Sequence, residues 1–423
     1  MQRETIAVHG GFKSDPTTRS VVVPIYQTTS FTFDDTQYGA DLFDLKIPGN
    51  IYTRIMNPTT DVLEQRMAQL EGGVASLGLA SGMAAITAAT LTLAKAGENI
   101  VATAQVYGGT YTFFKHSLGA LGIEARLVDG RDPAAFEASI DERTRMVYCE
   151  SVGNPAGNVV DIEAIAKVAH AHDLPLVVDN TVPTPILCRP FEHGADIVVH
   201  AMTKYLNGHG NSIGGIIVDS GRFHWPGNPR FPQFYTPEPA YHGVVYTESF
   251  GAAAFVARAR TVALRNTGGC ISPFNSFLIL QGIETLPLRM ERHCSNALAL
   301  ATWLQKHPKV AWVNFAGLPG NRDYALAQKY MDGGIPASLF TFGLKGGFAA
   351  CTRFMDKLEI IKRLVNIGDT RSLACHPAST THRQLSDAEL ATAGVSKDLI
   401  RLCVGIEHVD DLIADMEQAF AAA

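Results

Sequence analysis

A lysine and an aspartate each follow a run of apolar residues in the middle of the chain. Lys204 comes shortly after Ile197–Val199, which has the character of a buried strand, and Asp179 ends the apolar run that begins at Leu174. Lysine is seldom fully buried without a partner, and a desolvated lysine loses its proton readily and becomes a nucleophile. A single lysine in such a place is most often a surface residue on a loop, but the acid upstream favours a chemical role.

A lysine and an aspartate at two strand ends are the groups that pyridoxal phosphate needs. Lys204 would hold the aldehyde of this cofactor as a Schiff base, and Asp179 would pair with the protonated pyridine nitrogen. Open α/β sheets bind such ligands at the carboxyl ends of their strands. The pair therefore predicts a pyridoxal-phosphate site at one edge of a sheet.

Two further segments could complete this site. An apolar run over 74–80 predicts a strand, and it leads through Ser81, Gly82 and Met83 into a helix. Backbone N–H groups at such a junction can bind phosphate, although most junctions of this kind are plain turns, and it is the order along the chain that favours phosphate here. Tyr107 follows another expected strand, where an aromatic side chain is either part of the core or a platform for a flat ring.

The surrounding pattern predicts the elements that position these residues. Strands are expected at 74–80, 99–103, 123–128, 145–150, 174–179, 197–199 and 213–218, and helices at 60–71 and 161–172. The alternation of strands and helices is typical of a mostly parallel sheet covered by helices. We therefore expect an α/β protein whose strand ends bring the lysine and the aspartate together.

With 423 residues, the chain is too long for one compact core. Residues 1–60 show little helical periodicity and are expected to form an N-terminal arm. Residues 61–265 are expected to form the large domain with the cofactor site, and 266–423 a smaller α+β domain that begins with a linking helix. The segment 220–248 is rich in proline and aromatic residues and predicts a long ordered loop of functional or interfacial importance.

Composition argues against several classes of protein. The net charge of −6 gives no basic footprint for nucleic acid or for an anionic membrane. The N-terminus leads into no apolar signal segment, and no apolar run is long enough to span a bilayer. The seven cysteines are scattered without a Cys-x-x-Cys pair, which fits a reducing cytoplasm and neither disulfides nor zinc. His209, His376 and His382 lack the spacing of metal ligands, so no metal is expected.

Seven motifs occur in order along the chain. They are Tyr-x-Arg-x-x-Asn-Pro-Thr at 52–59, Ser-Gly-Met-Ala at 81–84, Tyr-Gly-Gly-Thr-Tyr at 107–111, Asp-Asn-Thr at 179–181, Thr-Lys-Tyr-x-x-Gly-His at 203–209, His-Pro-Ala-Ser-x-Thr-His at 376–382 and Ile-Arg-Leu-x-Val-Gly-x-Glu at 400–407. Together they resemble the Cys/Met-metabolism family of pyridoxal-phosphate enzymes over essentially the whole chain. The resemblance implies the fold-type-I, aminotransferase-like architecture, with a mostly parallel seven-stranded sheet in the large domain and a smaller α+β C-terminal domain.

The resemblance assigns roles at the cofactor by position. Lys204 would be the Schiff-base lysine and proton shuttle, Asp179 would keep the ring nitrogen protonated, and Tyr107 would stack on the ring. The phosphate would be held by residues of two turns: Ser81, Gly82, Met83 and Thr203. One position departs from the family pattern, because Ala201 stands where the family usually has serine. The departure removes one hydroxyl contact, so that cofactor affinity is lower or a water takes its place.

The resemblance also assigns residues to the substrate and to a neighbouring subunit. Arg401 would clamp the α-carboxylate of an amino acid, helped by Asn154 and the backbone of Ser372; without the motif it would be an ordinary salt-bridge residue. Tyr52 and Arg54 would reach the phosphate of a neighbouring subunit, and Tyr52 would also contact the substrate. These contacts imply a homo-oligomer, a tetramer built as a dimer of dimers.

Three features resemble the O-acetylhomoserine sulfhydrylase branch of the family. They are the form of the first motif at 50–56, the loop that ends at 241–246, and Arg371 where cystathionine lyases and synthases carry glutamate. Methionine γ-lyases carry cysteine at the position of Gly109. The branch implies γ-replacement, which converts O-acetyl-L-homoserine and sulfide or methanethiol to L-homocysteine or L-methionine and acetate. O-Succinylhomoserine sulfhydrylase, cystathionine γ-synthase or γ-lyase, and a non-catalytic binding protein of the same fold stay open as alternatives.

Overall fold

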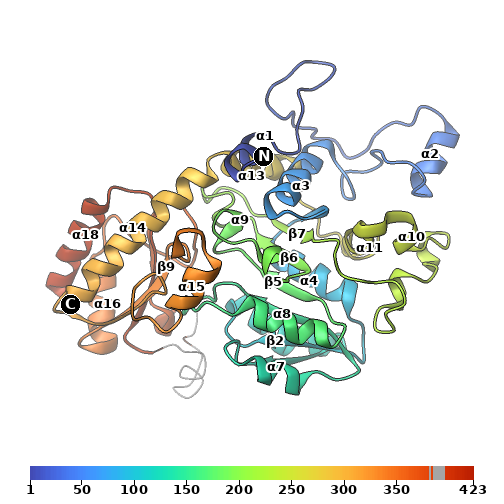
Figure 1. Ribbon diagram of the computed structural model, residues 1–423. Coiled ribbons are helices and arrows are strands. Elements are labelled where there is room, and N and C mark those ends of the chain that lie inside the picture. The colour runs from blue at the N-terminus through green and yellow to red at the C-terminus, as the bar shows by residue number, and fades with distance from the viewer. Residues whose placement is uncertain (381–382, 384–395) are drawn as a thin grey trace.

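Two β-sheets, each covered by helices, form the centres of two domains in the computed structural model (Figure 1). The structure describes residues 1–380, 383 and 396–423, so His382 of the sixth motif lies outside the described residues. The larger sheet has the strand order β1-β7-β6-β5-β4-β2-β3. Its strands are β1 (Ala75–Leu79), β2 (Asn99–Thr103), β3 (Glu124–Val128), β4 (Thr144–Glu150), β5 (Leu176–Asp179), β6 (Ile197–Ala201) and β7 (Gly215–Asp219). All seven expected strands are therefore present.

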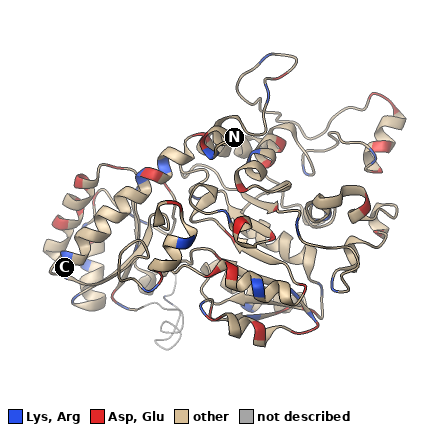
Figure 2. Cartoon of the chain, in the orientation of Figure 1, with Lys and Arg blue, Asp and Glu red and all other residues tan. Residues whose placement is uncertain are grey.

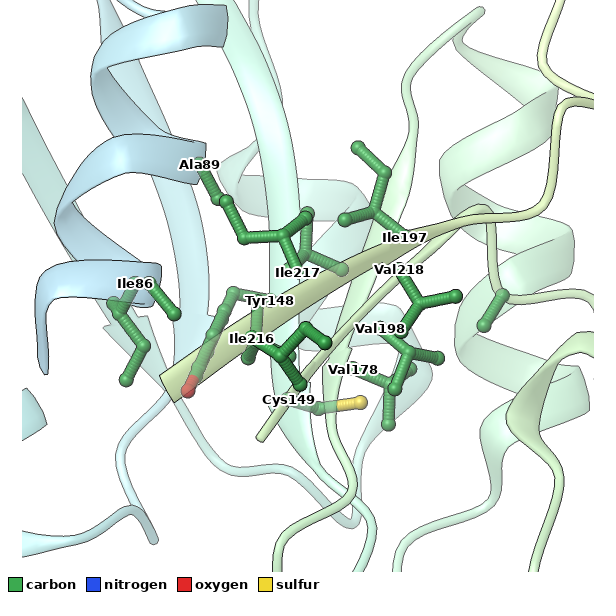
Figure 3. Close-up of a cluster of buried hydrophobic side chains, with 14 of the residues drawn as sticks. Ile86, Ala89, Tyr148, Cys149, Val178, Ile197, Val198, Ile216, Ile217 and Val218 are labelled. Atoms are coloured by element: carbon green, nitrogen blue, oxygen red, sulfur yellow. The ribbon is translucent and has the colours of Figure 1, made fainter. Parts of the chain in front are cut away.

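The central strands of this sheet are apolar on both faces because helices cover both faces. The residues Ile216, Ile217 and Val218 of β7 are fully buried. Figure 3 shows Ile86 and Ala89 of helix α4 (Gly82–Leu93) beside this cluster of side chains. Burial of each such side chain contributes about 1.5–3 kcal/mol relative to exposure, and this packing fixes the strand ends in place.

One strand departs from the parallel arrangement. β7 lies between β1 and β6 and runs antiparallel to both, whereas the other neighbouring strands are parallel. Two parallel neighbours need a crossover of a dozen or more residues, usually a helix, and the stretch 202–214 between β6 and β7 forms turns and no such helix. β1 and β6 stay parallel to each other, so their carboxyl ends share one edge with those of β4 and β5.

Helix ends follow the capping residues of the sequence. The expected helix at 60–71 is α3 (Pro58–Glu71), where the Asn57 side chain accepts from the Thr59 N–H and Gly72 takes a left-handed conformation at the end. The expected helix at 161–172 is α8 (Ile162–Ala171), capped by Asp161. The other helices of the large domain are α5 (Gly108–Thr112), α6 (Leu118–Ala120), α7 (Pro133–Ser139), α9 (Thr184–Leu187), α10 (Tyr246–Phe250), α11 (Ala254–Arg258), α12 (Arg265–Thr267) and α13 (Pro273–Glu284).

The N-terminal segment begins with a helix that its periodicity did not suggest. Helix α1 (Arg3–His9) buries Ile6 and Ala7 and packs on α3 and α13. The following chain, with helix α2 (Thr36–Phe43), stands away from the body of the protein (Figure 1). The arm character that we expected for 1–60 therefore describes the part after α1.

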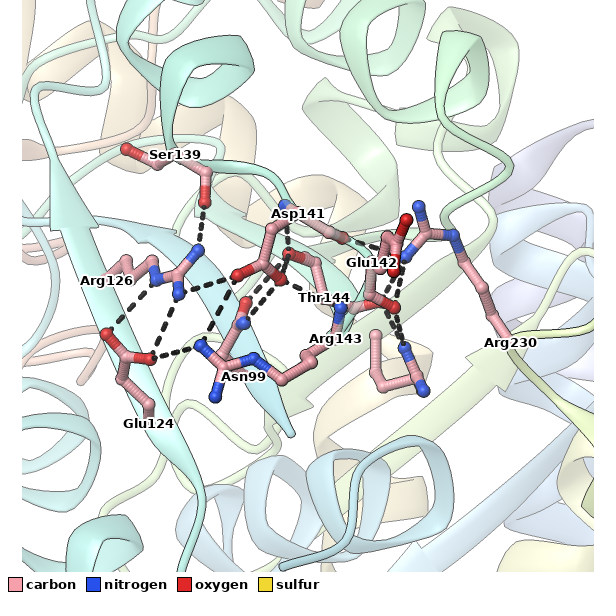
Figure 4. A network of polar contacts seen from close by, with 10 residues as sticks. Asn99, Glu124, Arg126, Ser139, Asp141, Glu142, Arg143, Thr144 and Arg230 are labelled. Atoms are coloured by element: carbon pink, nitrogen blue, oxygen red, sulfur yellow. Dashed lines mark hydrogen bonds and ion pairs between the residues drawn. The ribbon is translucent and has the colours of Figure 1, made fainter. Parts of the chain in front are cut away.

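The loop over 220–248 is ordered by its own aromatic residues. Trp225, Phe231 and Phe234 are buried with Phe255 of α11, and the ring centroids of Trp225 and Phe234 lie 4.2 Å apart. Arg230 of the same loop donates to the backbone oxygens of residues 141, 142 and 144, at the edge of the large sheet (Figure 4). The aromatic residues thus hold the loop against α11, and Arg230 holds it against the start of β4.

The smaller domain is built on a five-stranded sheet of order β10-β11-β12-β9-β8. Its elements are β8 (Val310–Asn314), β9 (Leu339–Leu344), β10 (Lys362–Arg363), β11 (Leu373–Cys375) and β12 (Leu399–Cys403), with helices α14 (Leu286–Lys306), α15 (Tyr324–Tyr330), α16 (Gly347–Lys357) and α18 (Val409–Ala422). In α14, Leu286 and Met290 join the core of the large domain, whereas Leu300 and Leu304 join that of the small domain. We propose that the domain boundary runs through α14; the division at residue 265 stays a prediction.

Charged residues of both signs are distributed over both domains (Figure 2). They pair locally, as in the network at the edge of the large sheet where Arg126 bonds Glu124 and Asp141 (Figure 4). No helix in the described part of the chain combines the length and the apolar character needed to cross a membrane. The seven cysteines are all free thiols.

Candidate active site

A cavity of about 240 Å³ opens at the carboxyl edge of the large sheet, against the small domain. Its wall is formed by the ends of β4, β5 and β6, by the start of α4, and by Arg401 and the segment 365–367 from the small domain. Eight residues singled out in the sequence line this one cavity: Ser81, Gly82, Met83, Tyr107, Asn154, Asp179, Thr203 and Lys204. Arg401 makes a ninth, so the fold brings together most of the candidate site.

Asp179 ends β5 and turns its carboxylate to the cavity. The backbone N–H of Thr181 donates to Oδ1 at 2.9 Å, and the buried Tyr148 hydroxyl donates to Oδ2 at 3.4 Å. Burial raises the pKa of Asp179, while bonds from Thr181 and the nearby His200 oppose this effect. A cationic ring nitrogen placed against this carboxylate would favour its charged form.

Lys204 lies in the turn after β6, next to the strand that ends in Asp179. Its Nζ donates to Oδ1 of Asn366 at 2.5 Å. Burial, and then the charge of Arg401, lower the pKa of the Lys204 amine. A buried amine with a lowered pKa and no carboxylate partner among the described residues is suited to act as nucleophile and base.

The start of α4 and Thr203, which directly precedes Lys204, line a further part of the cavity. Ser81 caps the helix, because its hydroxyl accepts from the backbone N–H of Ala84 at 3.1 Å. A Cβ atom on Gly82 would lie 2.6 Å from that of Ala201, so only glycine lets the helix start approach the end of β6 this closely. The helix N-terminus thus offers donors to an anion, and the Thr203 hydroxyl, which donates to the backbone oxygen of Gly214 at 3.3 Å, lines the same cavity.

Tyr107 stands at the start of α5, after β2, with 47% of its surface exposed. Its backbone N–H donates to Oε1 of Glu150 at 2.6 Å. A Cβ atom on Gly109 would lie 2.5 Å from the Tyr107 ring, so glycine provides the room for this ring position. The side chain lines the cavity and can stack on a flat ring.

Arg401 lies in the middle of β12 and is only 6% exposed. Its Nη1 donates to Oδ1 of Asn154 at 2.9 Å and its Nη2 to the backbone oxygen of Asn366 at 3.1 Å. Among the described residues no carboxylate pairs with this guanidinium. A buried cation whose partners are all neutral is prepared to receive a carboxylate from a ligand.

These residues fit pyridoxal phosphate. The start of α4 with Thr203 suits the phosphate, Tyr107 suits the ring face, Asp179 suits the ring nitrogen and Lys204 suits the aldehyde. The donor set thus matches each of the four parts of the cofactor.

Glu150 and Asn366 line the cavity and bond to residues of the site, but the sequence predicted no role for either. Glu150 ends β4 beside Asp179, with the same strand-end signal. Asn366 comes from the far end of the chain and stands between Val365 and Ile367, a pattern without a distinguishing signal. The hydrogen bonds of both residues to site residues appear only in the folded protein.

Three expected residues do not line the cavity of their own chain. Ser372 is buried, and both its N–H, at 2.6 Å, and its hydroxyl donate to the carboxylate of Glu407, so its backbone is not available to a ligand. The expected role of Ser372 in clamping a substrate therefore stays a prediction, and it would require this bond to Glu407 to change. Tyr52 and Arg54 lie in the arm, where Arg54 donates to the backbone oxygen of Arg265, and their role toward a neighbouring subunit stays a prediction.

Within residues 1–380, 383 and 396–423, no group of three or more His, Cys, Asp and Glu side chains could hold a metal ion. His376, one of the three dispersed histidines, bonds Ser379 and the backbone oxygen of Lys397. His209 bonds the backbone oxygen of Asn207.

Known proteins resemble this chain over its full length. It is 52% identical to the O-acetyl-L-homoserine sulfhydrylase of Leptospira meyeri, with 98% of this chain and 96% of that protein covered. It is also 52% identical to the homocysteine synthase of Schizosaccharomyces pombe, with 99% and 98% covered. The fold matches a Campylobacter jejuni protein assigned as an O-acetylhomoserine (thiol)-lyase, with a TM-score of 0.97, 41% identity and 100% of both chains covered.

The Campylobacter jejuni structure contains a lysine joined to pyridoxyl phosphate. Its agreement with the present fold confirms the expected fold-type-I architecture. The model of the family described as Cys/Met metabolism PLP-dependent enzyme matches residues 4–421. With a site that fits the cofactor and a match that spans both domains, this chain belongs to the Cys/Met metabolism family of pyridoxal-phosphate-dependent enzymes.

Proposed function

We propose that the chain catalyses γ-replacement on O-acetyl-L-homoserine. Acetate leaves the γ-carbon and sulfide, or methanethiol, takes its place, which gives L-homocysteine or L-methionine. The observation that carries this proposal is the placement of Lys204, Asp179 and the unpaired cation Arg401 around one cavity. The names of the Leptospira meyeri and Schizosaccharomyces pombe relatives support the donor and the product.

Bound pyridoxal phosphate supplies an electron sink next to the substrate amine. Asp179 would keep a proton on the ring nitrogen, which strengthens that sink. Tyr107 would hold the ring by stacking, and Ser81, Gly82, Met83 and Thr203 would hold the phosphate. With Ala201 in place of serine, this phosphate site has one hydroxyl fewer than is usual in the family.

The remaining tasks belong to Lys204 and Arg401. Arg401, oriented by Asn154, would bind the α-carboxylate and so fix the α-carbon near the lysine. Lys204 would anchor the cofactor at rest, and its amine, once released by the incoming substrate, would remove and return protons at the α-carbon. Burial, and then the charge of Arg401, lower the pKa of this amine and so favour its uncharged, basic form.

The test is a matrix of donors and nucleophiles with purified protein and cofactor. O-Acetyl-, O-succinyl- and O-phosphohomoserine would each be mixed with sulfide, methanethiol and cysteine, and products identified by mass spectrometry. Homocysteine from the acetyl donor and sulfide is expected to dominate, and Lys204→Ala is expected to form none. A preference for the succinyl donor, or for cysteine as nucleophile, would instead identify one of the alternative reactions of the family.

We also propose that the protein is a homo-oligomer, a dimer of dimers, in which Tyr52 and Arg54 complete the site of a neighbouring subunit. Support comes from the arm, which carries exposed apolar side chains at Val21, Val22 and Phe43 and stands away from its own domain (Figure 1). Light scattering after gel filtration measures the mass. Mixing unfolded and refolded Lys204→Ala and Arg54→Ala subunits tests the sharing, because activity returns only if the two residues act from different chains.

A cytoplasmic location is part of the same proposal. It is supported by the seven unpaired cysteines, six of them buried, because thiols stay reduced in the cytosol. Cell fractionation with detection of the native protein tests it, and recovery in a secreted or membrane fraction would contradict it.

A further inference from the structure

Glu150 is a buried acid in the cavity wall that the proposed chemistry does not use. It is the last residue of β4 and the register partner of Asp179 at the end of β5. Only 5% of its surface is exposed. Two carboxyl groups therefore stand side by side where Asp179 alone is needed to face a ring nitrogen.

Glu150 holds a neighbouring turn through a short hydrogen bond. Its Oε1 accepts the backbone N–H of Tyr107 at 2.6 Å, and this is the residue whose ring lines the cavity. Tyr107 leads into α5 through Gly108 and Gly109, and its backbone oxygen accepts the N–H of Tyr111 in that helix at 2.9 Å. Glu150 is thus the side chain that ties this turn to the rigid end of the sheet.

The residues around Glu150 do not stabilise the charged form of its carboxyl group. No lysine, arginine or histidine forms an ion pair with it among the described residues. Asp179 faces it from β5, Tyr148 and Cys149 precede it in β4, and the two cations Lys204 and Arg401 line other parts of the cavity. Two adjacent carboxyl groups without a cation between them do not both ionise readily.

Burial and the neighbouring carboxylate favour the protonated form of Glu150. Asp179 accepts bonds from the Thr181 backbone and the Tyr148 hydroxyl, which favour its charged form. Burial, and then the charge of Asp179, raise the pKa of Glu150 well above its ordinary value, and the backbone bonds from Tyr107 and Asn154 oppose this only in part. A neutral Glu150 leaves Asp179 as the single charged acceptor at the sheet edge.

We propose that Glu150 is a positioning residue that fixes the Tyr107 turn, and with it the Tyr107 ring, by a hydrogen bond in which its oxygen and not its charge is required. The inference rests on the proposed stacking role of Tyr107. It predicts that a neutral side chain with the same oxygen serves as well as the acid.

Two variants of nearly equal size separate the oxygen from the charge. Glu150→Gln keeps a carbonyl oxygen at the same reach, and Glu150→Met keeps the length of the side chain without an acceptor. Full-length proteins would be reconstituted with pyridoxal phosphate, and cofactor affinity, the visible circular dichroism of the bound cofactor and the pH profile of its absorption would be measured. The visible circular dichroism reports the orientation of the bound cofactor ring in the site. A general loss of protein stability does not change this orientation.

The Gln variant is expected to match the wild type in affinity, circular dichroism and pH profile. The Met variant is expected to lose cofactor affinity on the order of fivefold, as for one lost hydrogen bond, and to change the circular dichroism. Glu150→Asp keeps the carboxylate on a shorter side chain that no longer reaches the Tyr107 N–H, so it is expected to resemble the Met variant. It provides the same test if the Met variant does not fold.

Two results would overturn the inference: a Gln variant as impaired as the Met variant, because charge would then be required, or Met and Asp variants indistinguishable from the wild type. A wild-type protein that binds no cofactor would overturn the proposed function as well. A normal wild type beside unaffected variants overturns the role of Glu150 alone.

Discussion

The amine of Lys204 donates to the side-chain oxygen of Asn366 over 2.5 Å, across the junction of the two domains. The backbone oxygen of the same asparagine accepts from Arg401 at 3.1 Å. Asn366, a neutral residue of the small domain, therefore accepts hydrogen bonds from both Lys204 and Arg401. Because the amide carries no charge, it orients the Lys204 amine without opposing the effect of burial and of Arg401, which lower the pKa of that amine.

Exchange of this amide for a carboxylate is expected to impair the base. In Asn366→Asp, the new charge would raise the pKa of Lys204, since an opposite charge within about 4–6 Å favours the charged form. The amine acts as a base when it is uncharged, so the rate of proton removal rises as the pH passes through its pKa. A higher pKa therefore moves this rising limb of the pH–rate profile to higher pH, by about one pH unit or more. The exchange of the α-proton of a bound amino acid for deuterium, followed by NMR against pH, measures the limb. Asn366→Ser, which stays neutral, is the control, and an unmoved limb in the Asp variant contradicts the argument.

The geometry of Arg401 predicts a defect in substrate affinity rather than in turnover. Arg401→Lys keeps the positive charge but loses the planar fork that contacts Asn154 and Asn366. Loss of one hydrogen bond to a charged group costs about 1.5–3 kcal/mol, so KM for the amino-acid donor is expected to rise on the order of tenfold or more, with a smaller change in kcat. Steady-state kinetics measure both constants.

Arg371→Lys is the matched control for that variant. Arg371 pairs with Asp369 at 2.9 Å, and its side chain is 61% exposed. The exchange is expected to leave both constants unchanged. Equal effects of the two exchanges would show that Arg401 has no special part in binding.

Gly108 and Gly109 offer a matched pair in the turn that carries the aromatic ring. A Cβ at Gly109 would lie 2.5 Å from the Tyr107 ring, whereas a Cβ at Gly108 meets nothing within 4 Å. Gly109→Ala is expected to turn the ring, to change the absorption of the bound cofactor and to lower kcat severalfold. Gly108→Ala is expected to leave activity unchanged and to add about 0.5–1 kcal/mol of stability, because alanine is favoured over glycine in a helix. Enzyme assays, cofactor spectra and thermal unfolding compare the two proteins, and equal losses of activity would refute the ring contact.

The parts of this site that could be predicted from the sequence are those with a local signal. Asp179 and Lys204 follow apolar runs of strand length, and Ser81 precedes a glycine and a helix, so strand ends and a cap are visible before any tertiary contact is known. The helix α3 begins and ends where Pro58 and Gly72 require. Such signals depend on a few neighbouring residues and survive in the folded protein.

The parts that could not be predicted depend on distant contacts. Asn366 reaches Lys204 across 162 positions of the chain, and nothing in its neighbourhood marks it. Ser372 carries a family motif, yet its N–H is taken by Glu407, which only the packed small domain reveals. β7 runs antiparallel to β6 because the chain between the two strands forms no crossover helix. Helix α1 is too short for its sequence to show a clear helical periodicity. Tertiary packing decides each of these features.

Asp219 links the stability of the large domain to pH. It ends β7, its Oδ1 accepts the N–H of Gly221 at 2.8 Å, and its Oδ2 is buried without a partner among the described residues. Burial raises the pKa of Asp219 to about 7, with a further contribution from the nearby Asp196. The folded protein therefore binds a proton that the unfolded chain has already released between about pH 4 and pH 7. Stability is expected to fall as the pH rises through this range and to level off above it.

The Asp219→Asn variant removes this dependence and can keep the bond to Gly221. Each unit of pKa change corresponds to about 1.4 kcal/mol, so at pH 8 the variant is expected to be more stable than the wild type by an amount on the order of a few kcal/mol. Below about pH 4 the difference is expected to vanish, since the wild-type acid then becomes neutral in the unfolded state as well. Glu150 and Asp179 carry raised pKa values in both proteins and cancel in the comparison. Urea unfolding at pH 5, 6, 7 and 8, at one protein concentration, measures the difference, and a constant difference across this series would show that Asp219 is already ionised in the folded protein.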